Sequence, residues 1–250
     1  MERYRVGSLG ELVEQVVRLV DAEPNVVWFR GQKSSSWNLT AGIWRSHDAA
    51  DERNFTNRFR ARSATRHATF VPGYRDWAYW LSLMQHYGLP TRLLDWTRSP
   101  LIAAYFAVAD YVYSPDAAAA DASVWVLRPH TLNRIEDFAR IGDVTPPIDA
   151  KSCEELLEPA FTIQADEPTK VVAVMAAERD LRIFVQQGCF TVHSDQAPLN
   201  RRHRADEYLA QLVVPAQAVR SLARELDICG FRKGDIFPDL EHLADELVRR

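Results

Sequence analysis

The order of apolar and polar residues predicts helices mainly in the first half of the chain and strands mainly in the second. Ser8 and Glu11 have the spacing of a capping box, and apolar residues then recur at helical intervals up to Val20. Because the two kinds of element are segregated, the pattern favours an α+β fold over alternating α/β units. Further helices are predicted over residues 53–70, 74–87, 101–111 and 215–226 and at the C-terminus, and strands over 26–29, 91–96, 123–127, 170–175, 189–193 and 208–214.

Two stretches lack a clear period. Residues 33–52 read as a loop that contains a run of three serines and two tryptophans, and residues 131–168 are rich in proline and acidic residues. We expect 131–168 to be an irregular insertion, either covering a site or forming a surface excursion. No internal repeat or clean linker separates it from the rest, so we expect a single domain over residues 1–250.

The segment between Gln85 and Ser99 mixes His, Arg, Asp and Thr densely with apolar residues. Gly88 and Pro90 are typical of a helix end, and Ser99 followed by Pro100 is typical of a helix start. Each polar group that enters a buried turn costs about 1–3 kcal/mol unless it is hydrogen-bonded, and a helix N-terminus suits an anion. The density of polar groups therefore indicates a binding or catalytic site.

Each member of this segment also has an ordinary structural explanation. His86 could complement a helix C-terminus, Ser99 could only cap a helix, and Asp95 could pair with Arg92. The cluster is stronger evidence for a site than any one residue in it.

The block from Gln85 to Phe106, together with Phe29-Arg30-Gly31, resembles the FRG domain, a bacterial family named for that tripeptide. Further matches lie at Arg182-Ile183, Gln186, Gly188, Phe190 and Phe237-Pro238-Asp239-Leu240, so the resemblance spans Val27 to Leu247.

The layout of three segments also resembles the plan of ADP-ribosyltransferases. In that plan a first-strand Arg or His anchors nicotinamide adenine dinucleotide (NAD), a Ser/Thr motif precedes a helix, and a late strand carries Glu or Gln near the reacting ribose. The corresponding segments are Arg30, Thr97-Arg98-Ser99 and Gln186-Gln187-Gly188. The resemblance implies a split mixed or antiparallel β core with flanking helices. It also implies a transferase that uses NAD, acting as a toxin or in defence against phage.

The resemblance assigns roles to residues, because breaking the nicotinamide–ribose bond needs a cation for the diphosphate, aromatic walls and a carboxylate. Gln186 departs from the plan, since an amide cannot act as a general base, and Asp95, Glu178 or Glu241 would have to supply the carboxylate. The expected catalytic residues are Arg30, His86, Asp95 and Gln186, and the expected NAD-binding residues are Arg30, Gly31, Gln32, Tyr87, Arg92, Thr97, Ser99 and Tyr105.

The formal net charge of −4 gives no global attraction to nucleic acid, but the charge distribution is uneven. Residues 53–75 contain six arginines, three interleaved phenylalanines and no acidic residue. Such a run is either a solvated helix face or a surface that follows phosphates. We expect Arg58, Arg62 and Arg66 to bind an acceptor, for which DNA or RNA is the candidate.

Two hypotheses of different class follow. The first is the NAD-dependent transferase, and the second is a non-catalytic module that binds a nucleotide or a nucleic-acid end. A hydrolase with Asp95 and His86 as an acid–base pair is a third, weaker alternative.

Several other classes lack their signatures. The chain has no phosphate-binding loop of the Gly-Lys-Ser/Thr type, no dinucleotide glycine fingerprint, no nucleophile elbow and no metal-ligand spacing among its seven His and three Cys. No apolar run approaches a membrane span and no secretion signal is visible, so the expected location is the cytoplasm. The tryptophans are expected in the core, with Trp96 as the one that could contact a ligand, and His193 is expected to be a core histidine.

Overall fold

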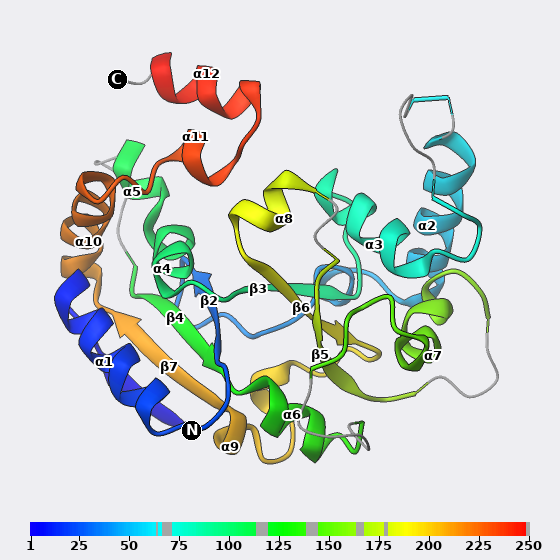
Figure 1. The fold of residues 1–250 in the computed structure, drawn as a ribbon, viewed down its shortest axis with the longest axis horizontal. Coiled ribbons are helices and arrows are strands. Elements are labelled where there is room, and N and C mark those ends of the chain that lie inside the picture. Colours follow the sequence, from blue (N-terminus) through cyan, green and yellow to red (C-terminus); the bar gives the residue numbers. More distant parts are fainter. Residues whose placement is uncertain are drawn as a thin grey trace.

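The sheet of this protein is built from strands that are far apart in the sequence. The computed structural model describes residues 1–63, 65–66, 72–113, 120–138, 145–163, 168–177 and 180–248. Within these residues seven strands form one sheet in the order β1-β7-β4-β2-β3-β6-β5 (Figure 1). The strands are β1 (Glu2–Arg5), β2 (Trp28–Gln32), β3 (Leu93–Thr97), β4 (Ala122–Leu127), β5 (Val171–Met175), β6 (Gly188–His193) and β7 (Leu209–Val214).

The sheet is antiparallel except at one edge, where β1 runs parallel to β7. Strand β2 pairs with β4 at five positions, and β3 pairs with β6 at five positions. By contrast, β2 and β3 pair only where Phe29 lies opposite Thr97. The sheet therefore consists of two halves that separate beyond this one pair.

Helices cover one face of each half-sheet, as Figure 1 shows. Helices α1, α4 and α10 form one apolar core with β1, β7, β4 and β2, and α3 and α7 form a second with β3, β6 and β5. None of the described helices is long and apolar enough to cross a membrane. The helices are α1 (Leu9–Asp21), α2 (Ala49–Ser63), α3 (Trp77–His86), α4 (Pro100–Val108), α5 (Asp110–Tyr113), α6 (Pro129–Ile135), α7 (Glu154–Leu157), α8 (Leu181–Val185), α9 (Ala205–Tyr208), α10 (Ala216–Ile228), α11 (Lys233–Ile236) and α12 (Leu240–Val248), with single 3₁₀ turns at Ile43–Arg45, Lys151–Cys153, Glu158–Ala160 and Leu199–Arg201.

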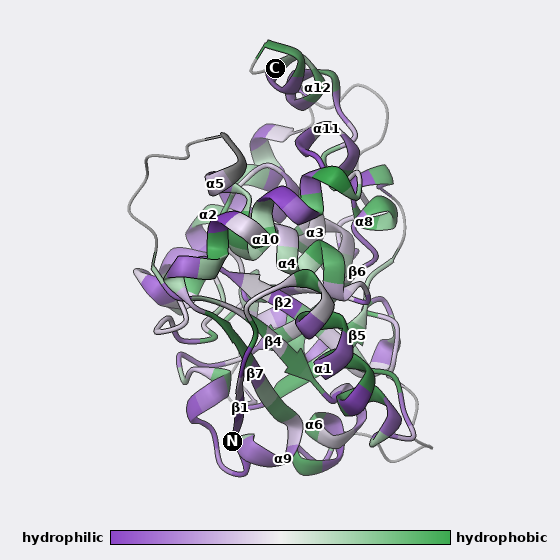
Figure 2. Ribbon diagram, turned by 90° about the vertical axis from the view of Figure 1, so that its left-hand side faces the viewer, coloured by the Kyte–Doolittle hydropathy of each residue, from purple (hydrophilic) through white to green (hydrophobic). Residues whose placement is uncertain are grey.

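A third apolar core fills the opposite face of the sheet, under α6 and α9. It includes Trp28 and Leu94 from the strands and Leu132 from α6. Hydrophobic residues accordingly concentrate on central strands such as β4 and β7 in Figure 2, while many helices carry hydrophilic residues as well. The sheet is thus covered on both faces, which explains why its central strands are almost continuously apolar.

The α+β organisation expected from the sequence is confirmed, and so are two helix starts. The hydroxyl of Ser8 accepts a hydrogen bond from the backbone N–H of Glu11, and the hydroxyl of Ser99 accepts one from Ile102. Strand β1 was not predicted, because Glu-Arg-Tyr-Arg carries no apolar alternation and is held by its backbone pairing with β7.

The expectation of an irregular insertion over residues 131–168 is wrong for the described part of that segment. Helix α6 contributes the buried Leu132, and α7 contributes the buried Leu156. The side chain of Asn133 donates to the backbone carbonyl of Ala173 at 2.9 Å and accepts from its N–H at 2.7 Å, so α6 is fastened directly to β5. Residues 139–144 and 164–167 lie outside the described residues.

Candidate functional site

A cleft of about 880 Å³ opens where β2 and β3 separate. Its walls come from both strands, from the loop after β2, from the end of α3 and from the segment between α8 and β6. The predicted site residues that line it are Arg30, Gly31, Gln32, His86, Asp95, Thr97 and Gln186. The cleft therefore brings together residues from three separate parts of the sequence.

Arg30 bridges the gap between the two half-sheets. Its Nη1 donates a hydrogen bond to the backbone carbonyl of Asp95, at a position where β3 does not pair with β2. The same Nη1 lies 3.8 Å from the carboxylate of Asp95. The Nε atom is buried without a hydrogen-bond partner among the described residues. Burial lowers the pKa of Arg30 to about 10, with Asp95 opposing and Arg45 adding to the effect. At neutral pH Arg30 remains a cation, and one of its donors is unused.

Asp95 presents an exposed carboxylate in the cleft that neighbouring side chains hold in place. The Nε2 of Gln85 donates to one carboxylate oxygen at 2.5 Å, and the hydroxyl of Thr91 donates to the amide oxygen of Gln85. The side chain is 61% exposed. Gln85 belongs to the motif recognised in the sequence, but its contact with Asp95 was not predicted.

His86 contacts an acidic residue that was not predicted from the sequence. The Nδ1 atom of His86, the last residue of α3, lies 2.6 Å from the carboxylate of Asp180. The other oxygen of Asp180 accepts from the N–H of Arg182 at 2.8 Å and caps α8. Asp180 thus fixes the histidine ring against the start of α8. No periodicity marked residues 176–187 as helical, which concealed this contact.

Thr97 and Gln186 reach the cleft, but part of their polar capacity is used within the fold. The hydroxyl of Thr97 donates to the backbone carbonyl of Gln186 at 2.7 Å and accepts from the N–H of Ser99 at 3.0 Å. The side-chain amide of Gln186 donates to the backbone carbonyl of Ile236 at 3.1 Å. Ser99 itself caps α4 and does not line the cleft.

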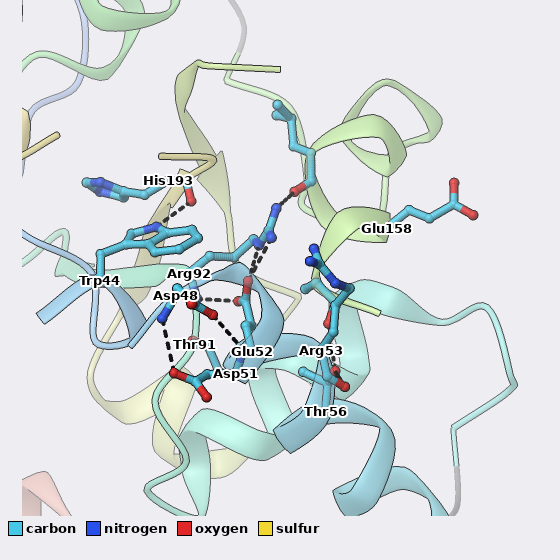
Figure 3. Close-up of polar contacts among 12 residues, drawn as sticks. Trp44, Asp48, Asp51, Glu52, Arg53, Thr56, Thr91, Arg92, Glu158 and His193 are labelled. Carbon is cyan, nitrogen blue, oxygen red and sulfur yellow. Dashed lines mark hydrogen bonds and ion pairs between the residues drawn. The ribbon is translucent and has the colours of Figure 1, made fainter. Parts of the chain in front are cut away.

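The assignment of Arg92 to cofactor binding is corrected by the structure. Its guanidinium is 0% exposed, donates to the buried carboxylate of Glu52 at 2.7 and 3.0 Å, and donates to the carbonyl of Leu156 at 2.8 Å (Figure 3). Arg92 therefore ties α2 and α7 to the start of β3 and is not available to a ligand.

Two tyrosines and one glycine also differ from expectation. Tyr105 is buried in the first core, and Tyr87 lies on another hollow of the surface, so neither is a wall of the cleft. Gly31 does line the cleft, but a Cβ atom there would lie 1.9 Å from the carbonyl oxygen of Ala103 in α4. The absence of a side chain at Gly31 is therefore required by the packing of α4 on β2.

Gln32 is held by hydrogen bonds on both ends of its side chain. Its amide oxygen accepts from the indole N–H of Trp125 at 2.7 Å, and its amide nitrogen donates to the backbone carbonyl of Asn38 at 3.3 Å. It therefore anchors the loop after β2 along the cleft wall.

That loop supplies the cleft residues that the sequence did not reveal. Trp37 is 54% exposed and lines the cleft with Trp44, whereas Trp96 is buried and donates to the hydroxyl of Thr191 at 3.0 Å. Trp96, the tryptophan expected to contact a ligand, also lines the cleft but is 3% exposed, so Trp37 offers the more accessible ring. The available signal was a tryptophan in a serine-rich loop without apolar periodicity.

The charges that line the cleft favour an anion. Arg30, Lys33, Arg45 and Arg182 supply positive charge, and Asp95 and Asp180 are the acidic residues among the described lining residues. One of the cations, Lys33, already pairs with Asp110 at 2.6 Å. Glu241 is not a lining residue, and Glu178 lies outside the described residues. No group of three or more His, Cys, Asp or Glu in the described part of the chain is placed to hold a metal ion.

The three arginines expected to bind an acceptor lie apart from the cleft residues. Arg58, Arg62 and Arg66 surround a separate hollow of about 520 Å³, together with Phe55, Phe59 and Tyr87. His193, which was expected to be a core histidine, is fully buried, and its Nε2 forms a hydrogen bond with the hydroxyl of Thr191 at 2.9 Å.

The profile of the FRG domain family matches residues 25–114. This range includes Phe29-Arg30-Gly31 and the block from Gln85 to Phe106. The resemblance expected at Arg182–Phe190 and at Phe237–Leu240 lies outside the matched range. Neither the curated proteins nor the solved structures compared with the chain gave a match.

Proposed function

We propose that the cleft binds NAD and that the protein transfers its ADP-ribose group to an acceptor. The observation that carries this proposal is the pairing of a half-buried cation, Arg30, with an exposed carboxylate, Asp95, at the gap between β2 and β3. The cleft volume of about 880 Å³ lies within the range of pockets for molecules of this size, and its walls combine aromatic rings with net positive charge. Those properties suit a dinucleotide, which carries two heterocycles and a diphosphate.

The chemistry needs charges at two places. In the transfer, the bond between nicotinamide and C1′ of the ribose breaks, and nicotinamide leaves as a neutral molecule with the bonding electrons. An atom of the acceptor donates an electron pair to C1′, and its proton passes to a base. In this scheme Arg30 and Arg182 hold the diphosphate, and Asp95 stabilises the positive charge that develops on the ribose. Trp37 and Phe106 offer faces against which the rings can stack.

His86 is the side chain best suited to receive the acceptor proton. The contact between its Nδ1 and Asp180 orients the ring, as a carboxylate does for a histidine base in other enzymes. Gln186 would then position the acceptor or the ribose, since its amide cannot take up a proton.

The departure at Gln186 supports a second candidate. Gln186, which ends α8 just before β6, offers an amide in place of a carboxylate, and that amide already donates to the carbonyl of Ile236. If the cleft binds a ligand but catalyses no reaction, the protein is a binding module for a nucleotide or a nucleic-acid end.

The test is to incubate the purified protein with NAD labelled in the adenosine part and to measure both nicotinamide release and label transfer to components of a cell lysate. We expect Asp95→Asn to lower the rate by about 100-fold or more, because it removes the carboxylate charge and keeps the shape. Glu241→Gln is the matched control, since it removes an acidic charge from a residue outside the cleft, and it should retain the rate.

Calorimetric titration of NAD into the same variants separates the two candidates. Binding without turnover in the wild-type protein would favour the non-catalytic module. Absence of binding would reject NAD as the ligand. Arg30→Lys is used in place of Arg30→Ala, because Arg30 also bridges the half-sheets, and each variant is checked for its unfolding temperature. Growth arrest on expression, lost in Asp95→Asn, would support the toxin or phage-defence setting.

A further inference from the structure

The hollow beside α2 combines exposed cations with aromatic rings that are at least partly exposed. Six of the residues around it are Arg58, Arg62 and Arg66 on the one hand and Phe55, Phe59 and Tyr87 on the other. The phenylalanines are half-buried and Tyr87 is 61% exposed. The hollow is thus an apolar floor with a basic rim.

The three arginines of the rim have no acidic partner in the described part of the chain. Arg58 and Arg62 are one helical turn apart on α2, so both project from the same face. Arg66, in the turn after α2, donates from Nη1 to the backbone carbonyl of Arg62 at 2.8 Å and so stays beside it.

Arg60, on the same helix, differs from the rim arginines because it packs on aromatic rings. Its guanidinium lies 4.1 Å from the ring centroid of Tyr74 and 5.3 Å from that of Phe161, so it serves the packing of the fold. The rim arginines make no such ring contact among the described residues. The rim therefore carries positive charge that is available to a partner.

The aromatic floor leads towards the cleft. The rings of Phe59 and Tyr87 lie 6.5 Å apart, and the ring of Tyr87 meets His86 edge-on at 5.0 Å. His86 lines the cleft. A chain that occupied the hollow could therefore reach the cleft by passing Tyr87 and His86.

We infer that this hollow binds single-stranded nucleic acid, with phosphates on Arg58, Arg62 and Arg66 and bases on Phe59 and Tyr87. Accessible rings beside a basic rim fit this ligand, because unpaired bases stack on aromatic side chains while the backbone phosphates contact cations. A duplex keeps its bases stacked inside and would leave the floor unused. That the bound strand is the acceptor of ADP-ribose rests on the proposed function, whereas its binding does not.

The experiment measures binding of fluorescein-labelled 12-nucleotide oligomers to the full chain, without NAD, by fluorescence anisotropy over a series of salt concentrations. The arms are single-stranded DNA, single-stranded RNA of the same sequence, duplex DNA and an acidic peptide with phenylalanines. One variant is Arg58→Ala/Arg62→Ala/Arg66→Ala. Its matched control is Arg3→Ala/Arg5→Ala/Arg224→Ala, which removes the same charge from exposed positions on β1 and α10, at the opposite edge of the sheet from α2 (Figure 1).

We expect the rim variant to bind a single strand about tenfold or more weakly and the control to bind as the wild type does. The slope of log affinity against log salt should become shallower by about 2, since each phosphate contact on a single strand contributes about 0.7. Tyr87→Ala should weaken binding about fivefold or more, while Tyr87→Phe should keep it, because stacking needs the ring and not the hydroxyl.

Any of four results would overturn the inference: no binding of either single strand, equal weakening by both triple variants, tighter binding of duplex than of single strands, or binding of the acidic peptide alone. The NAD assays are independent of this result. If a single strand binds through the rim but the protein does not turn over NAD, the nucleic-acid site is supported and the transferase proposal is rejected. Turnover unaffected by the rim variant and by added oligomers would leave the transferase and reject the strand as its acceptor.

Discussion

Arg30 and Arg92 look alike in sequence, since each adjoins a short apolar strand, yet they have opposite roles in the structure. Arg92 is enclosed and bonded to Glu52 and Leu156, while Arg30 borders the cleft with an unused Nε. The residue that decides between these roles is Glu52, which is 40 positions away from Arg92 in the sequence and on another element. Local pattern carries no information about such a partner.

The buried pair of Arg92 and Glu52 gives a direct test of this assignment. We expect Arg92→Met to lower the free energy of unfolding by about 3–5 kcal/mol, because it leaves the Glu52 carboxylate buried without its partner. The double variant Arg92→Met/Glu52→Leu should recover much of the loss. Urea unfolding at neutral pH measures both, and a single variant as stable as the wild type would contradict the structural role.

At the scale of elements, the helices with caps were predictable and the contacts between elements were not. Ser8 and Ser99 mark their helices by chemistry that acts within four residues, so the sequence is sufficient. Helix α8 is only five residues long, and its place beside the cleft depends on Asp180 and on the C-terminal segment. The prediction therefore found Gln186, named Arg182 as a family match without a role at the site, and missed Asp180.

The C-terminal segment, residues 232–248, supports one wall of the cleft. The carbonyl of Ile236 accepts from Gln186, and the ring of Phe237 lies 4.9 Å from the guanidinium of Arg182 and 5.8 Å from the ring of Phe106. All three of these contacted residues line the cleft. The C-terminal segment thus positions a cation, an amide and an aromatic ring at the site.

Phe237→Ala should release this wall without unfolding the sheet. We expect faster amide hydrogen exchange in residues 181–187 and 232–248 and unchanged exchange in β7, because Phe237 contacts Arg182 and Phe106 and is not part of the β7 pairing. Leu240→Ala, at an exposed residue of α12, is the control. Mass spectrometry of deuterium uptake reads both, and equal uptake in the two variants would argue against a supporting role for Phe237.

For the molecule as a whole, one buried histidine makes stability depend on pH. Burial, with contributions from Arg202 and Arg30, lowers the pKa of His193 from 6.5 to about 3. Between these values the unfolded chain binds a proton that the folded chain does not. The stability that His193 contributes is therefore complete above pH 6.5 and is lost as the pH falls towards 3.

We expect this contribution to the free energy of unfolding to fall by up to about 1.4 kcal/mol per pH unit below pH 6.5. His193→Phe removes it, so the stability of this variant relative to the wild type should rise as the pH is lowered. Urea unfolding at pH 7, 6 and 5 gives the difference. Parallel pH dependences in the two proteins would show that His193 is not the group responsible.

The single pair between β2 and β3 has a mechanical consequence. On one face each half-sheet has its own core, and each has its own ladder of hydrogen bonds, whereas the core on the opposite face spans both halves. The line between the half-sheets is therefore a seam, and its strand pairing would open first under a load that pulls the half-sheets apart. Arg30 connects the two half-sheets across this seam through its hydrogen bond to Asp95. A ligand that contacted both half-sheets would form a second connection. Occupancy of the cleft would then set how rigidly the two halves of the molecule move together.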